Sequence, residues 1–238
     1  MKTWAKILGA SALLVVGAAL AAEIVHKAVP CGTWRYKVTV NVDTPEGLKT
    51  GHAVREAKVC LVKHLVPEVA DADVNPKGEA VVVDLGKRGV LFALTNFDNY
   101  QILWSVFPGP PAFEEKGLRY YETLKAKAVL KPDQYPQMVM FKDITDPKSV
   151  TMAKGWVFDV KTQQHVPVDH LAELFGAGVT IKDVTVEMTE EPVTWGIEKR
   201  LGWLSANKGG YLDGQFAGGG PELSNILHGG NFKHGDEK

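Results

Sequence analysis

The sequence predicts an α+β fold, made mostly of antiparallel sheet with a few short helices and preceded by an N-terminal transmembrane or signal helix. Short runs of alternating apolar and polar residues are separated by clusters of turn residues, as in antiparallel strands. Helical spacing of apolar residues is confined to short segments, so helices are expected to be few. The chain has 238 residues, 45% of them hydrophobic, which is enough for the core of one domain with appendages.

The charge distribution argues against one class of partner. The net charge is −1, from 27 basic and 28 acidic residues, and no five consecutive residues carry like charges. A protein that binds nucleic acid normally presents a basic stripe. We therefore expect no nucleic-acid partner.

Residues 1–25 have the layout of an export signal. Lys2 and Lys6 precede an uncharged stretch over 7–22. Small residues just before Ala22 suit cleavage by a signal peptidase. Alternatively, the apolar stretch extends to residue 25, roughly the length that spans a bilayer, and remains as an anchor. Both interpretations place the rest of the chain outside the cytoplasm.

The two cysteines, Cys31 and Cys60, predict a disulfide, because an exported protein with an even number of cysteines usually pairs them. Residues 34–42 alternate as a half-buried strand, and a second extended run follows a turn at 43–47. A four-residue loop over 44–47 makes paired positions sum to 91, which sets the cysteines opposite each other. The bond would clasp the open end of this hairpin and stabilise it by roughly 3–4 kcal/mol. The alternative is two free, buried thiols.

The middle of the chain predicts a series of short elements. They are a polar turn over 71–78, a buried strand over 78–86, a hairpin turn at 86–89, a second extended element over 88–96, a loop or short helix over 97–116, a helix over 117–131 that Pro132 ends, and a strand over 138–142.

The strand predicted over 179–188 contains a defect in its alternation. Its apolar residues change from odd to even positions, through Val179, Ile181, Val184, Val186 and Met188. A change of phase requires one extra residue, so we predict a bulge at Lys182-Asp183.

The C-terminal third predicts a short helix and a tail. The segment TWGIEKRLGWL follows Pro192 and places Ile197, Leu201 and Leu204 on one side of a helix. Residues 208–238 contain nine glycines and are expected to lack a core of their own. The predicted organisation is therefore a signal segment over 1–25, an exported α+β domain over 26–207 and a glycine-rich tail over 208–238.

Several segments carry a resemblance to a known group of proteins. They are RYKVTVNVDTPEGLKTGHAVREAKV, GEAVVVDLGKRGVLFAL, FKDITDPKSV, GVTIKDVTVEMTEEPVTWGIEKRLGWL and GGYLDGQF. Together these segments resemble a family of uncharacterised exported or membrane-anchored proteins of Gram-negative, chiefly alphaproteobacterial, genomes. The resemblance covers roughly residues 33–96 and 138–233, with GIEKRL its most distinctive block. It implies a location in the cell envelope and transfers no catalytic residue.

Two motifs suggest a metal site, and neither is complete. Asp71-x-Asp73-x-Asn75 resembles the opening of a calcium loop, but Pro76 replaces the required glycine and no bidentate glutamate follows. We interpret this segment as a polar turn.

Histidines form the second incomplete motif. His165 and His170 flank Asp169, which more naturally caps the helix that follows, whereas zinc needs three or four converging ligands. His228 and His234 lie in the tail. We expect no metal and no cofactor.

The sequence also lacks the signatures of common enzymes. It has no G-x-S-x-G turn, phosphate loop or dinucleotide fingerprint, so we expect no catalytic residue. Glu187, Glu190 and Glu191 could form an acid pair, although surface solvation is the more common role of such residues.

The remaining candidates for function are Trp195, Arg200 and Trp203, because tryptophan and arginine often anchor interfaces. An amphipathic helix packed on the sheet is the alternative interpretation. We expect a non-catalytic, membrane-associated protein on the periplasmic side of the inner membrane, or in the soluble periplasm if cleaved. It would bind or organise a protein partner in the envelope, for example as an accessory subunit of a membrane complex. The alternative is a periplasmic hydrolase or small-ligand-binding protein.

Overall fold

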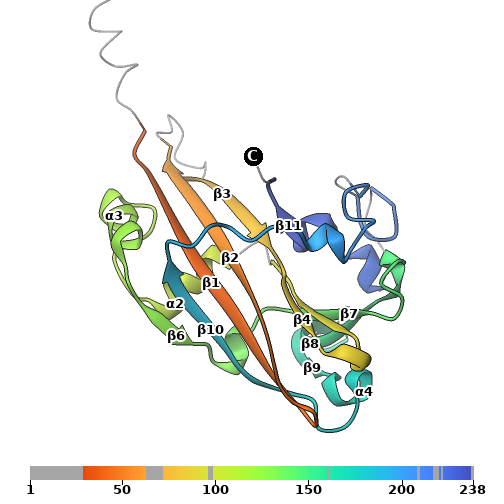
Figure 1. Cartoon of the computed structure of the whole chain (residues 1–238). Coiled ribbons are helices and arrows are strands. Elements are labelled where there is room, and N and C mark those ends of the chain that lie inside the picture. The colour runs from red at the N-terminus through yellow and green to blue at the C-terminus, as the bar shows by residue number, and fades with distance from the viewer. Residues whose placement is uncertain are drawn as a thin grey trace, which may run out of the picture.

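The computed structural model describes residues 29–62, 72–95, 99–159, 161–207, 210–216, 220 and 222–236 (Figure 1). The predicted signal or anchor segment, residues 1–25, lies outside this part of the chain. Within it, no helix has the length and apolar character needed to cross a membrane.

The larger of two sheets has six strands in the order β11-β3-β2-β1-β10-β6. Every neighbouring pair in it is antiparallel. Its strands are β1 (Cys31–Thr44), β2 (Gly47–Leu61), β3 (Ala72–Glu79), β6 (Lys127–Val129), β10 (Thr180–Thr189) and β11 (Lys233–His234).

The smaller sheet has five strands in the order β4-β5-β7-β8-β9, and it is also antiparallel. Its strands are β4 (Val81–Asp84), β5 (Val90–Ala93), β7 (Met138–Phe141), β8 (Val150–Asp159) and β9 (Gln164–Asp169). The α-helices are α2 (Asn99–Val106), α3 (Glu115–Thr123) and α4 (Leu171–Phe175). The prediction of mostly antiparallel sheet with a few short helices is confirmed.

The β1–β2 hairpin has the predicted register. Arg35 lies opposite Glu56, and Cys31 lies opposite Cys60 and forms a disulfide with it. The turn itself is shorter than the predicted four-residue loop, because Thr44 and Gly47 already pair and only two residues connect them. Both loops give the same sum of paired positions, so the register is unchanged.

The predicted bulge in β10 is confirmed. Asn41 pairs with Asp183, whereas the next residue, Val42, pairs with Ile181. Lys182 is the extra residue. It allows apolar side chains on both sides of the bulge to face the same core.

Strands β4, β5 and β7 of the smaller sheet form a middle layer between two cores. In β5, Leu91 and Ala93 contact the core shared with the larger sheet, whereas Phe92 faces a second core. The second core also contains Ile197, Leu201, Leu204, Leu212, Leu227 and Phe232. The C-terminal region therefore covers the far face of the smaller sheet, at the right of Figure 1.

The predicted polar turn over 71–78 is wrong in its described part, because Ala72–Glu79 is strand β3. Asp73 pairs with Cys60 and Asn75 with Lys58, so β3 extends the sheet beside the long strand β2. Pro76 is tolerated because β11 pairs only with the last residues of β3, which leaves the proline at a sheet edge.

The predicted helix over 117–131 is too long. Helix α3 ends at Thr123, and Lys127–Val129 form strand β6 instead. Strand β6 pairs with residues 185–187 of β10, and this pairing satisfies backbone groups that would otherwise form an open edge. Leu118 and Tyr121 are buried on the apolar side of α3, as its helical spacing predicts.

Removal of the disulfide tests its contribution to stability. The bond closes a loop with a sequence separation of 29, so Cys31→Ser/Cys60→Ser should lower the free energy of unfolding by about 3–4 kcal/mol. Guanidinium unfolding of both proteins with and without reductant measures this loss. Reductant should lower the midpoint of the wild type only. Equal midpoints for the wild type and the variant in the absence of reductant would contradict the expectation.

Candidate functional site

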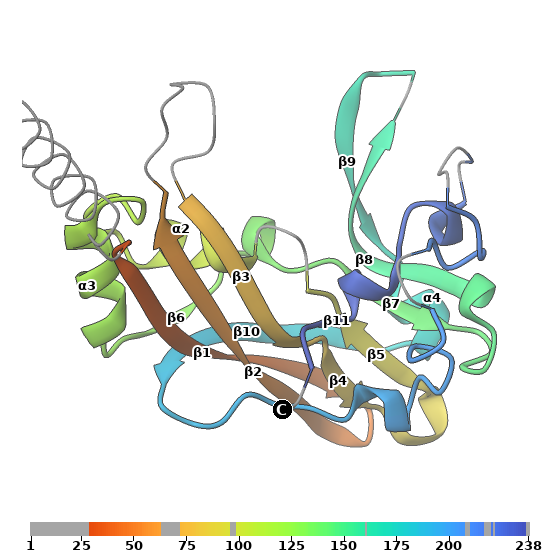
Figure 2. The same ribbon diagram turned by 90° about the horizontal axis from the view of Figure 1, so that it is seen from above.

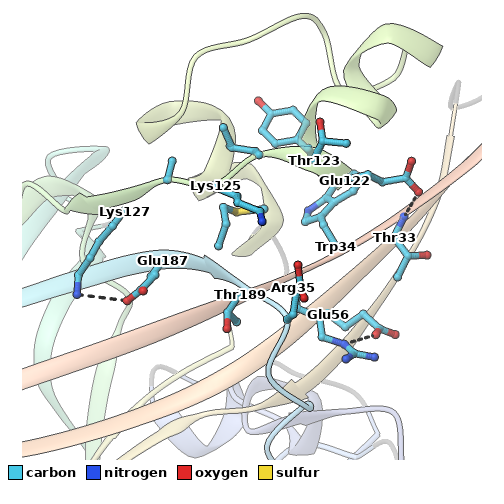
Figure 3. A pocket seen from close by; sticks show the side chains of 15 residues that line it. Thr33, Trp34, Arg35, Glu56, Glu122, Thr123, Lys125, Lys127, Glu187 and Thr189 are labelled. Carbon is cyan, nitrogen blue, oxygen red and sulfur yellow. Dashed lines mark hydrogen bonds and ion pairs between the residues drawn. The ribbon is translucent and has the colours of Figure 1, made fainter.

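A groove opens where β10 ends and β1 continues. Its volume is about 1020 Å³, and we call it the strand-end groove (Figure 3). It is lined by residues 33–35 of β1, 121–127 after and within α3, and 187–190 at the end of β10, together with Glu56 of β2. These segments are far apart in the sequence and meet only in the folded chain.

In the groove, side chains of α3 bond the backbone groups at the free edge of β1. The N–H of Thr33 donates to Oε1 of Glu122 at 3.1 Å. The guanidinium of Arg119 donates to the carbonyl of Cys31 at 3.4 Å and to Glu122 at 2.6 Å. The Arg119–Glu122 ion pair thus occupies two backbone groups of β1 that could otherwise pair with a further strand.

The rim of the groove carries mixed charges. Arg35 donates to Glu56 at 2.8 Å, and Lys127 lies 3.2 Å from Glu187. Lys125 and Glu190 also line the groove, and neither makes an ion pair within the described part of the chain. One cation and one carboxylate are therefore available to a ligand.

The inner wall of the groove is aromatic and apolar. The rings of Trp34 and Tyr121 lie 5.4 Å apart, and Leu124 and Met188 complete this wall. Burial raises the pKa of Tyr121, and the neighbouring Tyr120 adds to this effect. Trp34 is only 4% exposed, and its indole N–H has no acceptor among the described residues.

Two of the predicted partner-binding residues, Trp195 and Arg200, line a second and smaller cavity of about 420 Å³. Arg200 pairs with Asp84 at 2.7 Å, and the Lys233 ammonium lies 5.3 Å from the centre of the Trp195 ring. The N–H of Gly86 and then Arg200 lower the pKa of Asp84. Trp195 is half-buried and Arg200 is exposed, so a partner can reach both residues.

Trp203 lies apart from this cavity and packs, partly buried, against the second core. Its indole N–H donates to the carbonyl of Ile144 at 3.1 Å, and its ring contacts the edges of Phe141 and Phe232. The predicted helix around it is wrong, because only Ile197–Lys199 form a helical turn. Gly196 enters that turn with a φ of 116°, and irregular turns follow it.

Glu79 explains why this turn is held in place. Its side chain is buried and accepts the N–H of Ile197 at 2.9 Å. Burial raises the pKa of Glu79 above its usual value, although the backbone N–H groups of Gly196 and Ile197 oppose the shift. The carboxyl group thus anchors the C-terminal region to the end of β3.

The candidate metal and acid residues do not converge. His165 and His170 are exposed, and Asp169 accepts the N–H of Leu171 at 3.3 Å near the start of α4, close to its predicted capping role. Glu187 pairs with Lys127, and Glu191 pairs with Lys37. Burial lowers the pKa of His228 and of His234 in the tail. Over the described ranges, no three His, Cys, Asp or Glu side chains gather in a way that could hold a metal ion.

A second surface feature is the β8–β9 hairpin, which extends away from the rest of the molecule in Figure 2. It exposes the large apolar side chains of Trp156, Val157, Phe158 and Val166. Phe158 and His165 pair across the strands with their rings 5.4 Å apart, and Val157 pairs with Val166. Because adjacent residues of a strand face opposite sides, both faces of the hairpin carry apolar side chains.

A third cavity, of about 460 Å³, opens at the base of this hairpin. Trp156 and Pro167 line it on the hairpin side, and Tyr135 lines it on the body of the molecule. The consecutive apolar residues at 156–158 are a sequence signal for this hairpin. The strand-end groove has no comparable signal, because no single segment contains it.

The packing of Trp203 predicts a large loss of stability on truncation. Trp203→Ala should lower the free energy of unfolding by about 3 kcal/mol, whereas Trp203→Phe should cost about 1 kcal/mol through the lost hydrogen bond. Trp195→Ala is the matched control and should cost less, about 1 kcal/mol, because its ring contact is a single cation–π interaction with the Lys233 ammonium. Urea unfolding measures all three values. Equal losses for Trp203→Ala and Trp195→Ala would contradict this assignment.

Glu79 predicts a dependence of stability on pH. Its pKa is raised above the ordinary 4.5, so the folded chain binds this proton more tightly than the unfolded chain. The resulting stabilisation is fully present below pH 4.5 and is lost as the pH rises through the folded pKa. The free energy of unfolding of the wild type minus that of Glu79→Gln should therefore fall from this pH toward neutrality. Urea unfolding across a pH series measures this difference, and a constant or rising difference would contradict it.

No protein family, curated protein or solved structure matches the chain.

Proposed function

We propose that the chain is an exported, non-catalytic protein of the bacterial cell envelope that binds or organises a protein partner. In this proposal residues 1–25 associate it with the inner membrane, and the described domain lies on the periplasmic side. An accessory subunit of a membrane complex is the form of this function that we favour. The proposal includes membership of the family of uncharacterised envelope proteins that the sequence resembles.

The disulfide supports the proposed compartment. Cys31 and Cys60 are bonded at the open end of the longest hairpin. Disulfides of this structural kind persist in oxidising compartments such as the periplasm and are rare in the cytosol.

The observation that carries the partner-binding role is the β8–β9 hairpin. A two-stranded ribbon is marginally stable in water, and exposed apolar groups on both of its faces add to that cost. Burial against a partner would remove this apolar area from water. The cavity beside Trp156 and Tyr135 could receive an apolar side chain of that partner, as in the centre of many interfaces.

Trp195 and Arg200 are proposed as additional contacts. They lie on the surface beside Asp84, where an acidic or hydrogen-bonding group of the partner could share the guanidinium. Trp203 instead packs against Phe141 and Phe232, so we assign it a structural role.

The alternative, a hydrolase or small-ligand-binding protein, finds support in the volume of the strand-end groove. A hydrolase would need carboxylates that act on a substrate. In the groove, Glu56, Glu122 and Glu187 are held by Arg35, Arg119 and Lys127, which leaves Glu190 as the one carboxylate of its lining without an ion pair over the ranges that the structure describes. We therefore favour the partner-binding role.

Substitution of Phe158 tests the proposed surface. Phe158 is 51% exposed and Phe216 is 86% exposed, so Phe158→Ser and Phe216→Ser each remove an exposed phenyl ring, from different places on the molecule. We expect Phe158→Ser to reduce partner occupancy by about tenfold, because truncation of an aromatic anchor commonly weakens an interface on that scale. Native mass spectrometry of the full chain extracted from its membranes measures the occupancy.

The two variants also separate binding from folding. Phe216→Ser should keep a stoichiometric partner of defined mass, and both variants should melt at the temperature of the wild type. Full occupancy in Phe158→Ser, or equal losses in both variants, would overturn the proposal. A large drop in melting temperature for Phe158→Ser alone would assign the hairpin to internal packing instead.

A further inference from the structure

Strand β1 extends beyond its neighbour β10. The pairing between them stops where Arg35 lies opposite Thr189, whereas β1 continues to Cys31 and stays paired with β2 on its other side. Residues 31–34 therefore have one side that no strand occupies in the described chain. The strand-end groove lies along this side.

The backbone groups on this side can be identified from the bonds they make. The carbonyl of Pro30 accepts the N–H of Leu61 on the β2 side, whereas the N–H of Thr33 and the carbonyl of Cys31 bond α3. Backbone groups alternate in direction along a strand, so the N–H and C=O groups of the odd-numbered residues of β1 point into the groove. These are the groups through which a further strand would pair.

The groups that cover this edge are removable. Arg119 and Glu122 reach it with side chains that are 54% and 27% exposed. Surface ion pairs contribute little to stability, so the exchange of these two bonds for bonds to a peptide backbone has a small cost. A helix side chain that covers an edge also prevents unwanted pairing between chains.

The two walls of the groove differ in chemistry. Residues directly opposite in a sheet share a face, so Trp34 and Met188 lie on the core face, while Arg35 and Thr189 lie on the outer face. An added strand would point alternate side chains at these two walls. The apolar wall suits aliphatic side chains, and the outer wall, with Glu190 nearby, suits polar or basic ones.

We infer that the edge of β1 at residues 31–34 binds an extended peptide of a protein partner, which adds to the sheet antiparallel to β1 and continues the line of β10. The recognised peptide alternates apolar side chains with polar or basic side chains. Its backbone replaces Glu122 on the Thr33 N–H and Arg119 on the Cys31 carbonyl. The indole N–H of Trp34, buried and without an acceptor in the described chain, supplies a further donor beside the bound segment.

This site is separate from the β8–β9 hairpin and does not depend on the proposed function. Phe158→Ser should therefore leave peptide binding unchanged. Absence of peptide binding by the wild type would overturn this inference alone, whereas full partner occupancy in Phe158→Ser would overturn the proposed function alone.

The direct test uses a fluorescein-labelled heptapeptide in which valine alternates with threonine and lysine. Fluorescence anisotropy measures its binding to the full-length chain. Two further versions carry N-methyl groups on the odd or on the even amides. Only one of these patterns removes the donors that face β1, so one version should lose at least about tenfold in affinity while the other binds as the parent does.

Matched protein variants test the same edge. Thr33→Pro removes the N–H that faces the groove but no bond to β2, and proline is tolerated at such an edge. It should weaken binding by about tenfold, whereas Thr33→Val should not. Arg119→Ala/Glu122→Ala should strengthen binding by up to about tenfold, because two competing hydrogen bonds are lost. Arg88→Ala/Glu46→Ala removes an ion pair at the other end of the hairpin and should leave binding unchanged.

The result that overturns the inference is equally definite. Equal binding of the two N-methylated peptides shows that the main chain is not recognised. Wild-type affinity in a Thr33→Pro protein with an unchanged melting temperature shows that this edge is not used. Absence of binding up to about 1 mM, which is the weak end of specific affinities, also overturns it.

Discussion

The two sheets depend on one buried guanidinium. Arg55 of β2 is only 3% exposed, and its Nε donates to the carbonyl of Glu79 at 3.0 Å. One terminal nitrogen lies 3.3 Å from the carbonyl of Ala93 and 3.4 Å from that of Leu94. Arg55 therefore joins the larger sheet to the junction between β3 and β4 and to the end of β5. Burial lowers its pKa, and nearby Tyr36 and Glu79 favour the charged form. A buried guanidinium is stable only when its N–H donors have acceptors, so the strand ends that supply these carbonyls must stay in place.

With the sheets fixed in this way, surface features arise where neighbouring strands differ in length. Strand β1 extends past β10, and the remaining edge becomes the wall of the strand-end groove. Strands β8 and β9 extend past the body of the smaller sheet and become the projecting hairpin (Figure 2). The groove holds strand backbone groups that bond only side chains of α3, and the hairpin exposes apolar area to water. Protein partners commonly supply these two kinds of complement.

Two of the wrong predictions, the polar turn over 71–78 and the long helix over 117–131, have a common cause. The segment after Asp71 has turn chemistry, and residues 124–131 continue a helical spacing, yet both contain strands. Each segment lies beside a long strand whose open edge offers backbone hydrogen bonds. Pairing with that edge outweighs local preference, because propensities are worth only fractions of a kcal/mol per residue. Local sequence contains no record of which edge will be open.

The sequence by itself determined the β1–β2 register, the opposition of Cys31 and Cys60, and the bulge at Lys182, because each follows from a period of two within a short segment. It also identified Ile197, Leu201 and Leu204 as one apolar group. The folded chain alone shows that Trp203 packs against the second core, whereas Trp195 and Arg200 line a separate cavity. It alone assembled the groove from residues 33–35, 121–127 and 187–190. The physical reason is that periodicity shows which face of a segment is apolar, whereas the neighbour of that face depends on contacts between distant parts of the chain.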